Sequence, residues 1–327
     1  MNHTLAATIV LVVASGLDYL LGDPWGWLHP VQVMGAAIAR YSQWTLKHFQ
    51  TPHSQRIAGI GLGLGLILGS GGIGWILIYG ATLIHPWLGI GIQVIMLASC
   101  LAGRSLRQAA EAVLAPLADG KIAIARDTLS RYVGRDTHDL STPDIYRAIM
   151  ETISENAVDG VLAPLFYALL GAILSGVGSV PLALSYKAAS TLDSMVGYRD
   201  APYTYLGWFS ARLEDGLTWL PCRLSVLTLA LLSGRPRPVL RVCRRDAIAD
   251  PSPNAGWSEC AYAAVLGVQL GGVNRYGGVI KIKPLLADSR HPITPDIIRQ
   301  AMTLTRQVYG LWLALGLVGL GFLAYAS

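Results

Sequence analysis

One stretch of the sequence, residues 142–160, carries ionisable side chains at a spacing that could serve chemistry. Arg147, Glu151, Glu155 and Asp159 recur every four residues, so a helix would place them on one face as a charged stripe. Neighbouring carboxylates at this spacing repel each other by about 0.2–0.5 kcal/mol per pair, and a bound cation or cationic ligand would offset that repulsion. The alternative is a solvated helix face on which Arg147 is the internal counter-ion.

The residues around the charged stripe indicate how it is positioned. Thr142 is a suitable N-cap, and Pro143 and Asp144 suit the first turn of a helix. The helix then continues into the apolar residues 157–175, which are typical of a membrane segment. The stripe is therefore predicted to lie where a helix enters a bilayer.

Composition indicates an integral membrane protein. Of the 327 residues, 53% are hydrophobic and only 14% are charged, whereas soluble domains average about 25% charged residues. The net charge is +5 without a long Lys/Arg run, which argues against nucleic-acid binding. The four cysteines are isolated, so we expect neither a disulfide framework nor a zinc site.

The apolar runs predict an all-α, polytopic membrane protein of about five to seven membrane helices in one membrane-embedded domain, residues 1–327. Residues 5–102 would hold the first three membrane helices and 157–327 the remaining ones with their loops. Between them, 103–156 would form amphipathic cytoplasmic helices, ended by Gly120 and Gly134. Within the long run 57–84, the four-residue spacing of Gly61, Gly65 and Gly69 predicts close helix packing.

The positive-inside rule orients the chain. Residues 103–156 hold seven Lys/Arg, which places this segment in the cytoplasm and the N-terminus outside. If every apolar run crossed the bilayer, the basic loops would fall on both sides. At least one of the runs 181–196, 217–232 and 260–272 is therefore predicted to be re-entrant.

Polar clusters interrupt the apolar pattern near the predicted cytoplasmic ends. They are residues 22–24, 103–104, 131–137, 186–199, 212–215, 250–256 and 270–278. An ionisable group at the bilayer centre costs about 2.5–3.5 kcal/mol, so Lys187 and Asp193 should face a polar cavity or the interface. No Walker A, GxSxG or HExxH motif is present. The inventory suits phosphoryl or acyl-phosphate chemistry on an anionic substrate, or an ion-relay transport pathway.

Eight ordered blocks of the sequence resemble the CobD/CbiB family of cobalamin-biosynthesis membrane proteins, the adenosylcobinamide-phosphate synthases. The blocks run from about Asp18 to about Gly278 and read LDYLLGDPWGWLHPVQVMG, AGRSL, LSRYVGRDT, IYRAIMETISENAVDG, YKAASTLDSMVGY, GWFSARLEDGLTWLPCRL, PSPNAGWSECAYAAVLGVQLGG and YGG. The resemblance implies that ATP drives an amide bond between (R)-1-amino-2-propanol, or its O-phosphate, and the free propionate of adenosylcobyric acid. The product would be adenosylcobinamide or its phosphate.

The resemblance also implies a set of site residues. The family's signature blocks fall on Asp23, Arg104, Arg135, Asp136, Arg147, Glu151, Glu155, Asn156, Asp159, Tyr186, Lys187, Asp193, Tyr198, Arg212, Asp215, Asn254, Gly256 and Tyr276. Two departures are mild, because Ser190 stands where Asn is expected and Glu214 where Asp is common.

We expect these residues to divide into three groups by role. Some of Glu151, Glu155 and Asp159 would hold Mg²⁺ that bridges the phosphates of ATP. Arg147 and Lys187 are the expected catalytic cations and Asp193 or Asp215 the proton acceptor, while nucleotide and substrate binding would fall to Arg104, Arg135, Tyr186, Arg212, Asn254 and Tyr276. The alternative for each cluster is an ion pair: Arg147 with Glu151, Lys187 with Asp193 or an acidic residue on a neighbouring helix, and Arg212 with Asp215.

The expected partners follow from the same resemblance. They are adenosylcobyric acid, aminopropanol or its phosphate, and the lipid bilayer of the cell inner membrane, with the active site facing the cytoplasm. A homodimer and contacts with other late cobalamin-assembly enzymes stay open, and no nucleic acid is expected. The competing class is a membrane transporter or carrier of a corrinoid or other anionic ligand, which would leave its ligand chemically unchanged.

Overall fold

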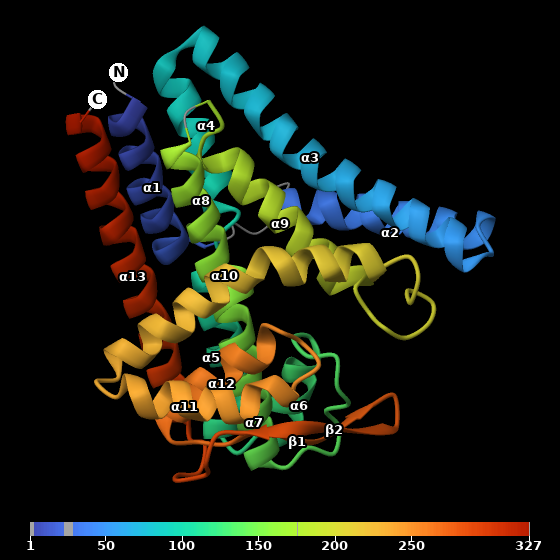
Figure 1. The fold of residues 1–327 in the computed structure, drawn as a ribbon. Coiled ribbons are helices and arrows are strands. Elements are labelled where there is room, and N and C mark those ends of the chain that lie inside the picture. Colours follow the sequence, from blue (N-terminus) through green and yellow to red (C-terminus); the bar gives the residue numbers. More distant parts are fainter. Residues whose placement is uncertain (1–2, 23–28, 175, 327) are drawn as a thin grey trace. The chain divides into compact units, whose positions relative to one another are not determined.

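The structure, a computed structural model, describes residues 3–22, 29–174 and 176–326, and these are mainly helical (Figure 1). The α-helices are α1 (His3–Leu20), α2 (Pro30–His48), α3 (Pro52–Ile84), α4 (Pro86–Ala98), α5 (Gly103–Ala118), α6 (Ile122–Ser130), α7 (Thr142–Asn156), α8 (Ala163–Ile173), α9 (Ser179–Val196), α10 (Trp208–Leu232), α11 (Pro236–Asp246), α12 (Ala255–Leu266) and α13 (Pro295–Ala326). A π-helical turn, η1 (Ala157–Leu162), joins α7 to α8, and a 3₁₀ turn, η2 (Ala247–Ala249), follows α11. Strands β1 (Leu270–Tyr276) and β2 (Val279–Leu286) form an antiparallel hairpin.

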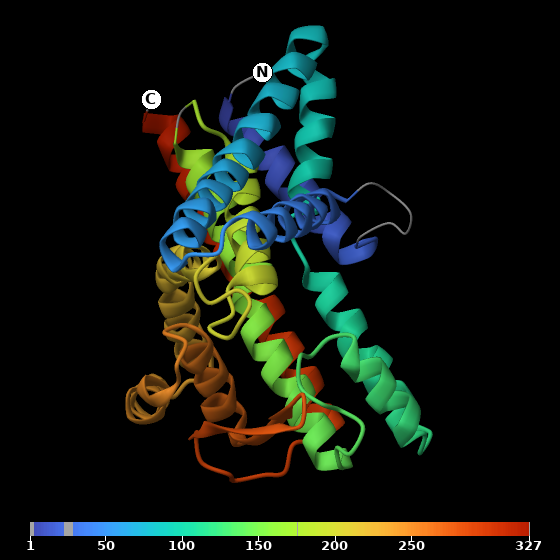
Figure 2. The same ribbon diagram turned by 90° about the vertical axis from the view of Figure 1, so that its right-hand side faces the viewer.

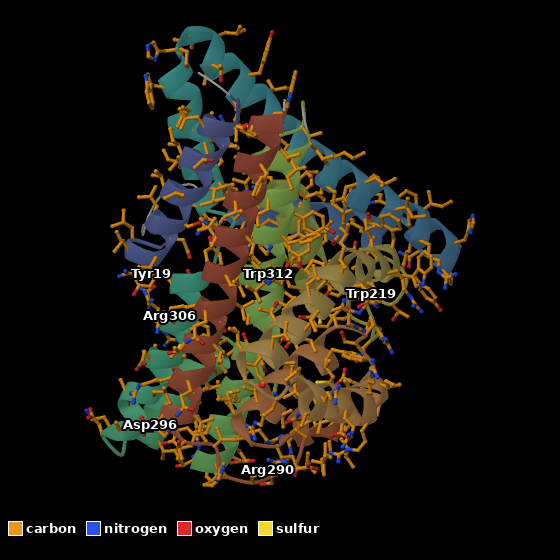
Figure 3. All side chains as sticks on the ribbon, turned by 60° about the vertical axis from the view of Figure 1, so that its left-hand side comes forward. Tyr19, Trp219, Arg290, Asp296, Arg306 and Trp312 are labelled. Atoms are coloured by element: carbon orange, nitrogen blue, oxygen red, sulfur yellow. The ribbon has the colours of Figure 1, made fainter. Side chains whose placement is uncertain are left out.

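Within the described residues, five helical stretches are long and apolar enough to cross a bilayer (Figure 2): Pro52–Ile84, Pro86–Ala118, Thr142–Ile173, Trp208–Leu232 and Pro295–Tyr325. A shorter apolar helix, Thr4–Leu20, precedes them. Figure 3 shows the last stretch, with Asp296 and Arg306 along its first part and Trp312 further on. The predicted all-α polytopic membrane fold is confirmed, because one chain holds several helices of spanning length.

The chain divides into two compact units. Unit 1 comprises Met1–Ala102, Ala163–Leu217 and Leu311–Ser327, and unit 2 comprises Gly103–Leu162 and Thr218–Gly310. In unit 1, α3 packs against α9 and α4, and α8 packs against α9. Its apolar core includes Leu11, Leu97, Ala183 and Leu184.

Glycines on α3 allow this close packing, but they are not the predicted ones. A Cβ added at Gly59 would overlap the carbonyl oxygen of Leu206, and one at Gly71 would overlap the hydroxyl of Ser185. Around Gly65 and Gly69, by contrast, nothing lies within 4 Å. Of the predicted row, only Gly61 faces another helix, at the Tyr41 hydroxyl of α2, and the close contacts of α3 within the described residues lie on a different face.

Gly59→Ala and Gly65→Ala should therefore differ in their effect on stability. The added methyl at Gly59 meets backbone that cannot move freely, so we expect destabilisation by about 1–3 kcal/mol. At Gly65 the methyl enters open space, and the higher helix propensity of alanine predicts no loss of stability. Thermal unfolding of the two detergent-solubilised variants measures this difference, and equal midpoints would contradict it.

Two predicted helix ends in unit 2 need correction. The N-cap of α7 is Ser141 and not Thr142, since the Ser141 hydroxyl accepts a hydrogen bond from the backbone N–H of Asp144 at 3.4 Å. Gly120 has a φ of 74° just after α5, as expected of a C-terminal glycine. Gly134 does not end α6, which already stops at Ser130.

The apolar run 260–272 does not form one continuous helix. Gly267, with a φ of 71°, ends α12 after Leu266, and the chain then enters β1 at Leu270. The hairpin was not predicted. Its signal was the pair Gly277-Gly278 between two β-prone stretches, and both glycines have positive φ, as a two-residue hairpin turn requires.

Candidate active site

The hairpin β1–β2 is held in unit 2 by the RYVGRDT segment, residues 131–137. The Asp136 carboxylate accepts hydrogen bonds from the backbone N–H groups of Gly277 and Gly278 at 3.0 and 2.8 Å. Its own N–H donates to the carbonyl of Arg275 at 2.8 Å. The hydrogen bond from Gly278 is the largest cause that holds the pKa of Asp136 below its usual value, so the carboxylate stays ionised at neutral pH.

Asp136→Ala should loosen the turn of the hairpin. Because the variant loses both acceptor oxygens, hydrogen exchange at the amides of Gly277 and Gly278 should accelerate about tenfold. Hydrogen exchange read by mass spectrometry on peptides that cover residues 270–286 provides the measurement. Unchanged exchange there would mean that Asp136 does not hold the turn.

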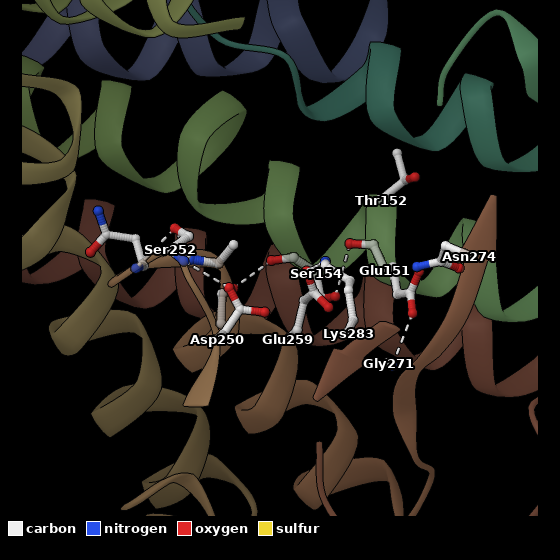
Figure 4. A network of polar contacts seen from close by, with 12 residues as sticks. Glu151, Thr152, Ser154, Asp250, Ser252, Glu259, Gly271, Asn274 and Lys283 are labelled. Atoms are coloured by element: carbon white, nitrogen blue, oxygen red, sulfur yellow. Dashed lines mark hydrogen bonds and ion pairs between the residues drawn. The ribbon is translucent and has the colours of Figure 1, made fainter. Parts of the chain in front are cut away.

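Beside Asp136, a buried group of charges joins the hairpin to α7. Arg135 donates to Oε2 of Glu151 and, at 2.8 Å, to Oδ1 of Asn274. The other oxygen of Glu151 accepts from the backbone N–H of Gly271 at 3.0 Å and lies 3.6 Å from Arg147. The side chains of Arg135 and Glu151 are only 7% and 2% exposed. The carboxylate of Glu151 is thus fully engaged, and Figure 4 shows it between Gly271 and Asn274.

Arg147 belongs to the same group. Its guanidinium donates to the carbonyls of Gly271 and Val273, to Oδ1 of Asn274 at 3.2 Å and to Asp144 at 3.2 Å. The ion-pair alternative for Arg147 and Glu151 is therefore realised in the structure. The side chains of Arg147 and Glu151 also hold strand β1 against α7 through hydrogen bonds, a role that the spacing of the charged stripe did not reveal.

A second group of charges lies next to the first, around Lys283 on β2. The Lys283 ammonium lies 3.1 Å from Oε1 of Glu259, whose side chain is fully buried on α12. The carboxylates of Glu155, Glu151 and Asp250 also act on Lys283. We call Lys283, Glu259, Asp250 and Glu155 the lysine cluster; Figure 4 shows its first three members close to Ser154.

The protonation of the lysine cluster follows from burial and from its excess of carboxylates. Burial, assisted by the charges of Glu155 and Glu151, raises the pKa of Glu259 to about 8 against the opposing effect of Lys283. Burial works against the charge of Lys283, but the surrounding carboxylates outweigh it and raise the pKa of the ammonium. Lys283 is therefore a permanent cation, while Glu259 titrates near neutral pH.

Several oxygens and nitrogens of these two groups have no hydrogen-bond partner. Within the described residues these atoms include Oε2 of Glu259, Oδ2 of Asp250 and Nδ2 of Asn274, all shielded from solvent. Buried polar atoms are rarely left in this state. These unpaired atoms indicate a site at which a ligand, a water molecule or a proton would complete the hydrogen bonds.

Other predicted site residues of unit 2 lie beside the hairpin turn, at the start of α12, in η1 and in α5. Tyr276 lies beside the turn with the ammonium of Lys281 5.6 Å from its ring centre. Asn254 is buried at the start of α12, where its carbonyl accepts from the Cys222 thiol. Asp159 lies in the π-helical turn η1, and Arg104 lies in α5. Asp23 is outside the described residues.

Five predicted residues belong to unit 1: Tyr186, Lys187, Asp193, Arg212 and Asp215. Tyr186 is buried and stacks on Tyr167 at a ring distance of 5.0 Å. Lys187 and Asp193 are half-buried on α9. Asp215 lies on α10, where the charges of Arg212 and Arg199 act on it.

Sequence reasoning missed Lys283, Glu259, Asp250 and Asn274 as site residues. A signal existed for Glu259, because it is the only acidic residue in the apolar segment 255–266. Asn274 and Asp250 fell inside polar clusters, but nothing in the sequence distinguished them from turn residues. Lys283 had no signal, since alternating lysines on a strand are usually surface residues.

The carboxylates of these two groups are better suited to a magnesium ion bound together with a nucleotide than to a metal ion whose ligands all come from the protein. Among the described residues, no three Asp, Glu, His or Cys side chains are grouped to hold a metal ion. Mg²⁺ in nucleotide sites needs only one or two carboxylates, because phosphates and waters complete its shell. Of the predicted ligands, Glu151 is occupied by Arg135, which leaves Glu155 and Asp159.

Comparison with known proteins identifies the family of the chain. A family model described as "CobD/Cbib protein" matches residues 11–305. The chain belongs to the CobD/CbiB family. It is 53% identical over 313 residues to "Cobalamin biosynthesis protein CobD" of Synechocystis, covering 96% of this chain and 92% of the relative.

Further relatives carry the same description. The identity is 42% over 307 residues with "Cobalamin biosynthesis protein CobD" of Klebsiella pneumoniae, which covers 93% of this chain and 94% of the relative. With "Cobalamin biosynthesis protein CbiB" of Salmonella arizonae it is 40% over 296 residues, which covers 89% and 91%. No solved structure matches. The resemblance read from the eight sequence blocks is thereby confirmed.

Proposed function

We propose that the protein forms the amide bond between (R)-1-amino-2-propanol, or its O-phosphate, and the free propionate of adenosylcobyric acid, with ATP as the driving cosubstrate. A carboxylate and an amine do not condense at neutral pH, so ATP first phosphorylates a propionate oxygen. The amine nitrogen then attacks the acyl carbon, phosphate leaves, and a carboxylate accepts the proton that the nitrogen loses. Family membership supports this chemistry.

We propose that the reaction takes place at the lysine cluster. The supporting observation is that the cation Lys283 lies beside several carboxylates. Lys283 has three N–H donors and one hydrogen-bonded acceptor, Glu259, and its side chain is 27% exposed. Its remaining donors can bind the propionate and stabilise charge on the acyl oxygen during attack. Fixed charges of this kind are most effective where water is excluded.

The surrounding residues take supporting roles in this proposal. Arg135 and Arg147 hold strand β1, and through the hairpin they position Lys283. Of the predicted metal ligands, Asp159 would hold the magnesium ion of Mg-ATP, which would neutralise phosphate charge when bound. Lys187, Asp193 and Asp215 stay candidates from the family resemblance alone, and the site is proposed to face the cytoplasm.

The test is incubation of the purified protein with adenosylcobyric acid, Mg-ATP and aminopropanol phosphate, read by mass spectrometry. We expect a mass gain equal to the amine less one water, and release of phosphate that depends on the amine. Lys283→Met should lower turnover about 10²–10³-fold, whereas Lys121→Met, which removes a surface lysine paired with Asp119, should not. Unchanged corrinoid mass would refute the synthase and favour a carrier.

A further inference from the structure

Glu259 presents an unusual combination of burial and missing contact. Its side chain is fully buried, Oε1 accepts from Lys283 at 3.1 Å, and Oε2 has no hydrogen-bond partner in the described part of the chain. A buried carboxylate oxygen without a donor costs free energy unless something absent from the protein itself supplies one. The oxygen therefore points to a ligand that donates hydrogen bonds.

Asp250 supplies a second oxygen of the same kind. Its Oδ1 accepts from the backbone N–H of Ser252 at 2.9 Å, which fixes the side chain, while Oδ2 is shielded from solvent and has no partner. Gly256 makes room for it, because a Cβ there would overlap Cβ of Asp250. Figure 4 shows the ends of Asp250 and Glu259 on the same side of Ser154.

Glu155 is the member of the lysine cluster whose side chain is exposed to solvent. Asp250 and Lys283 are among the charged groups that act on it. The four carboxylates of Glu151, Glu155, Glu259 and Asp250 thus lie near three cations, Arg135, Arg147 and Lys283. The surplus is negative, which favours a cationic ligand.

The geometry favours an ammonium group over a metal ion. No three carboxylates among the described residues come together as a metal site, and Mg²⁺ demands oxygens at about 2.0–2.1 Å in octahedral order. An ammonium group has three N–H donors and reaches oxygens at about 2.7–2.9 Å, so it tolerates carboxylates that stand further apart.

We infer that Oε2 of Glu259 and Oδ2 of Asp250, with Glu155 at the open side, bind the primary ammonium group of the amine substrate. The inference rests on the proposed function for the identity of the amine. The ammonium would then lie beside Lys283, so the amine and the propionate would be held next to each other by neighbouring side chains of opposite charge.

The test is direct binding of 1-amino-2-propanol to the full-length, detergent-solubilised protein by isothermal titration calorimetry, without ATP or corrinoid. Glu259→Gln and Asp250→Asn should each weaken binding about tenfold, since each removes one charge-assisted hydrogen bond. Glu155→Gln, at an exposed position, keeps the test available should the buried variants not fold. Asp119→Asn removes a surface carboxylate of the same unit and should bind as the wild type does.

Several results would overturn the inference. They are equal affinity of the wild type and the folded variants, no amine binding by the wild type, displacement of the amine by Mg²⁺, and equally tight binding of propane-1,2-diol. The synthase assay separates the two proposals. Amide product with an unchanged KM for the amine in Glu259→Gln or Glu155→Gln would refute this site alone, whereas amine binding here without product would refute the synthase alone.

Discussion

Arg135→Met is expected to destabilise the protein by about 3–5 kcal/mol, the range for breaking one side of a buried ion pair. The guanidinium contacts both Glu151 and Asn274, and both residues of the ion pair are almost fully buried. Its removal leaves the Glu151 carboxylate without its main partner in a region of low dielectric. Because Asn274 lies in β1, the hairpin that carries Lys283 should loosen as well.

The double variant Arg135→Met/Glu151→Gln separates the cost of an unpaired charge from the value of the pair. It leaves no uncompensated carboxylate, so we expect it to recover most of the lost stability. Arg135→Lys keeps the charge but cannot donate to two acceptors as a planar fork, and should be intermediate. Thermal unfolding in detergent measures all three, and a double variant no more stable than Arg135→Met would contradict this account.

Lys283→Met is expected to lose stability in a manner that depends on pH. In the folded protein the pKa of Glu259 is about 8, above its ordinary value of 4.5. A carboxyl group with a raised folded pKa contributes stability below its unfolded pKa, and the contribution is lost as the pH rises through the folded pKa. The raised pKa of Lys283 stabilises the folded protein over a different pH range. This contribution to stability is constant up to the usual pKa of 10.5 and is lost only above it.

Without Lys283, the Glu259 carboxylate has no cation in contact, and its pKa rises further. The part of the variant's cost that comes from Glu259 should therefore be small at pH 5 and grow as the pH rises above about 8, because the wild type can ionise Glu259 there, whereas the variant would create a buried carboxylate with no cation beside it. The added substitution Glu259→Gln should abolish this pH dependence. Unfolding midpoints across that range provide the measurement, and an equal loss at both ends would show that packing, not charge, explains the effect.

The charged stripe illustrates how far sequence periodicity reaches. Its spacing predicted that Arg147 and Glu151 lie on one face of a helix that runs into a membrane segment, and α7, η1 and α8 form that continuous stretch. Spacing did not reveal that the Glu151 carboxylate accepts hydrogen bonds from Arg135 and Gly271, because both partners come from other parts of the chain. Helical period is a local property, whereas pairing of buried charges depends on which elements meet.

The lysine cluster lay beyond the reach of the sequence for the same reason. Asp250 lies 95 positions after Glu155 in the sequence, and Lys283 lies 24 positions after Glu259. The two-glycine turn sets the register that places Lys283 opposite Gly272, and α12 brings Glu259 within 3.1 Å of it. A one-residue slip in the strand would turn Lys283 to the other face of the hairpin.

The sequence by itself determined the family, the helical membrane class and the helix that carries the charged stripe. Those properties follow from hydropathy, from the helical period of the charged residues and from ordered blocks of sequence, all of which are local features of the chain. Only the tertiary structure decided which glycines of α3 pack, which carboxylates are engaged and which remain open. These depend on contacts between distant segments, where burial removes water and makes each unpaired oxygen or charge costly.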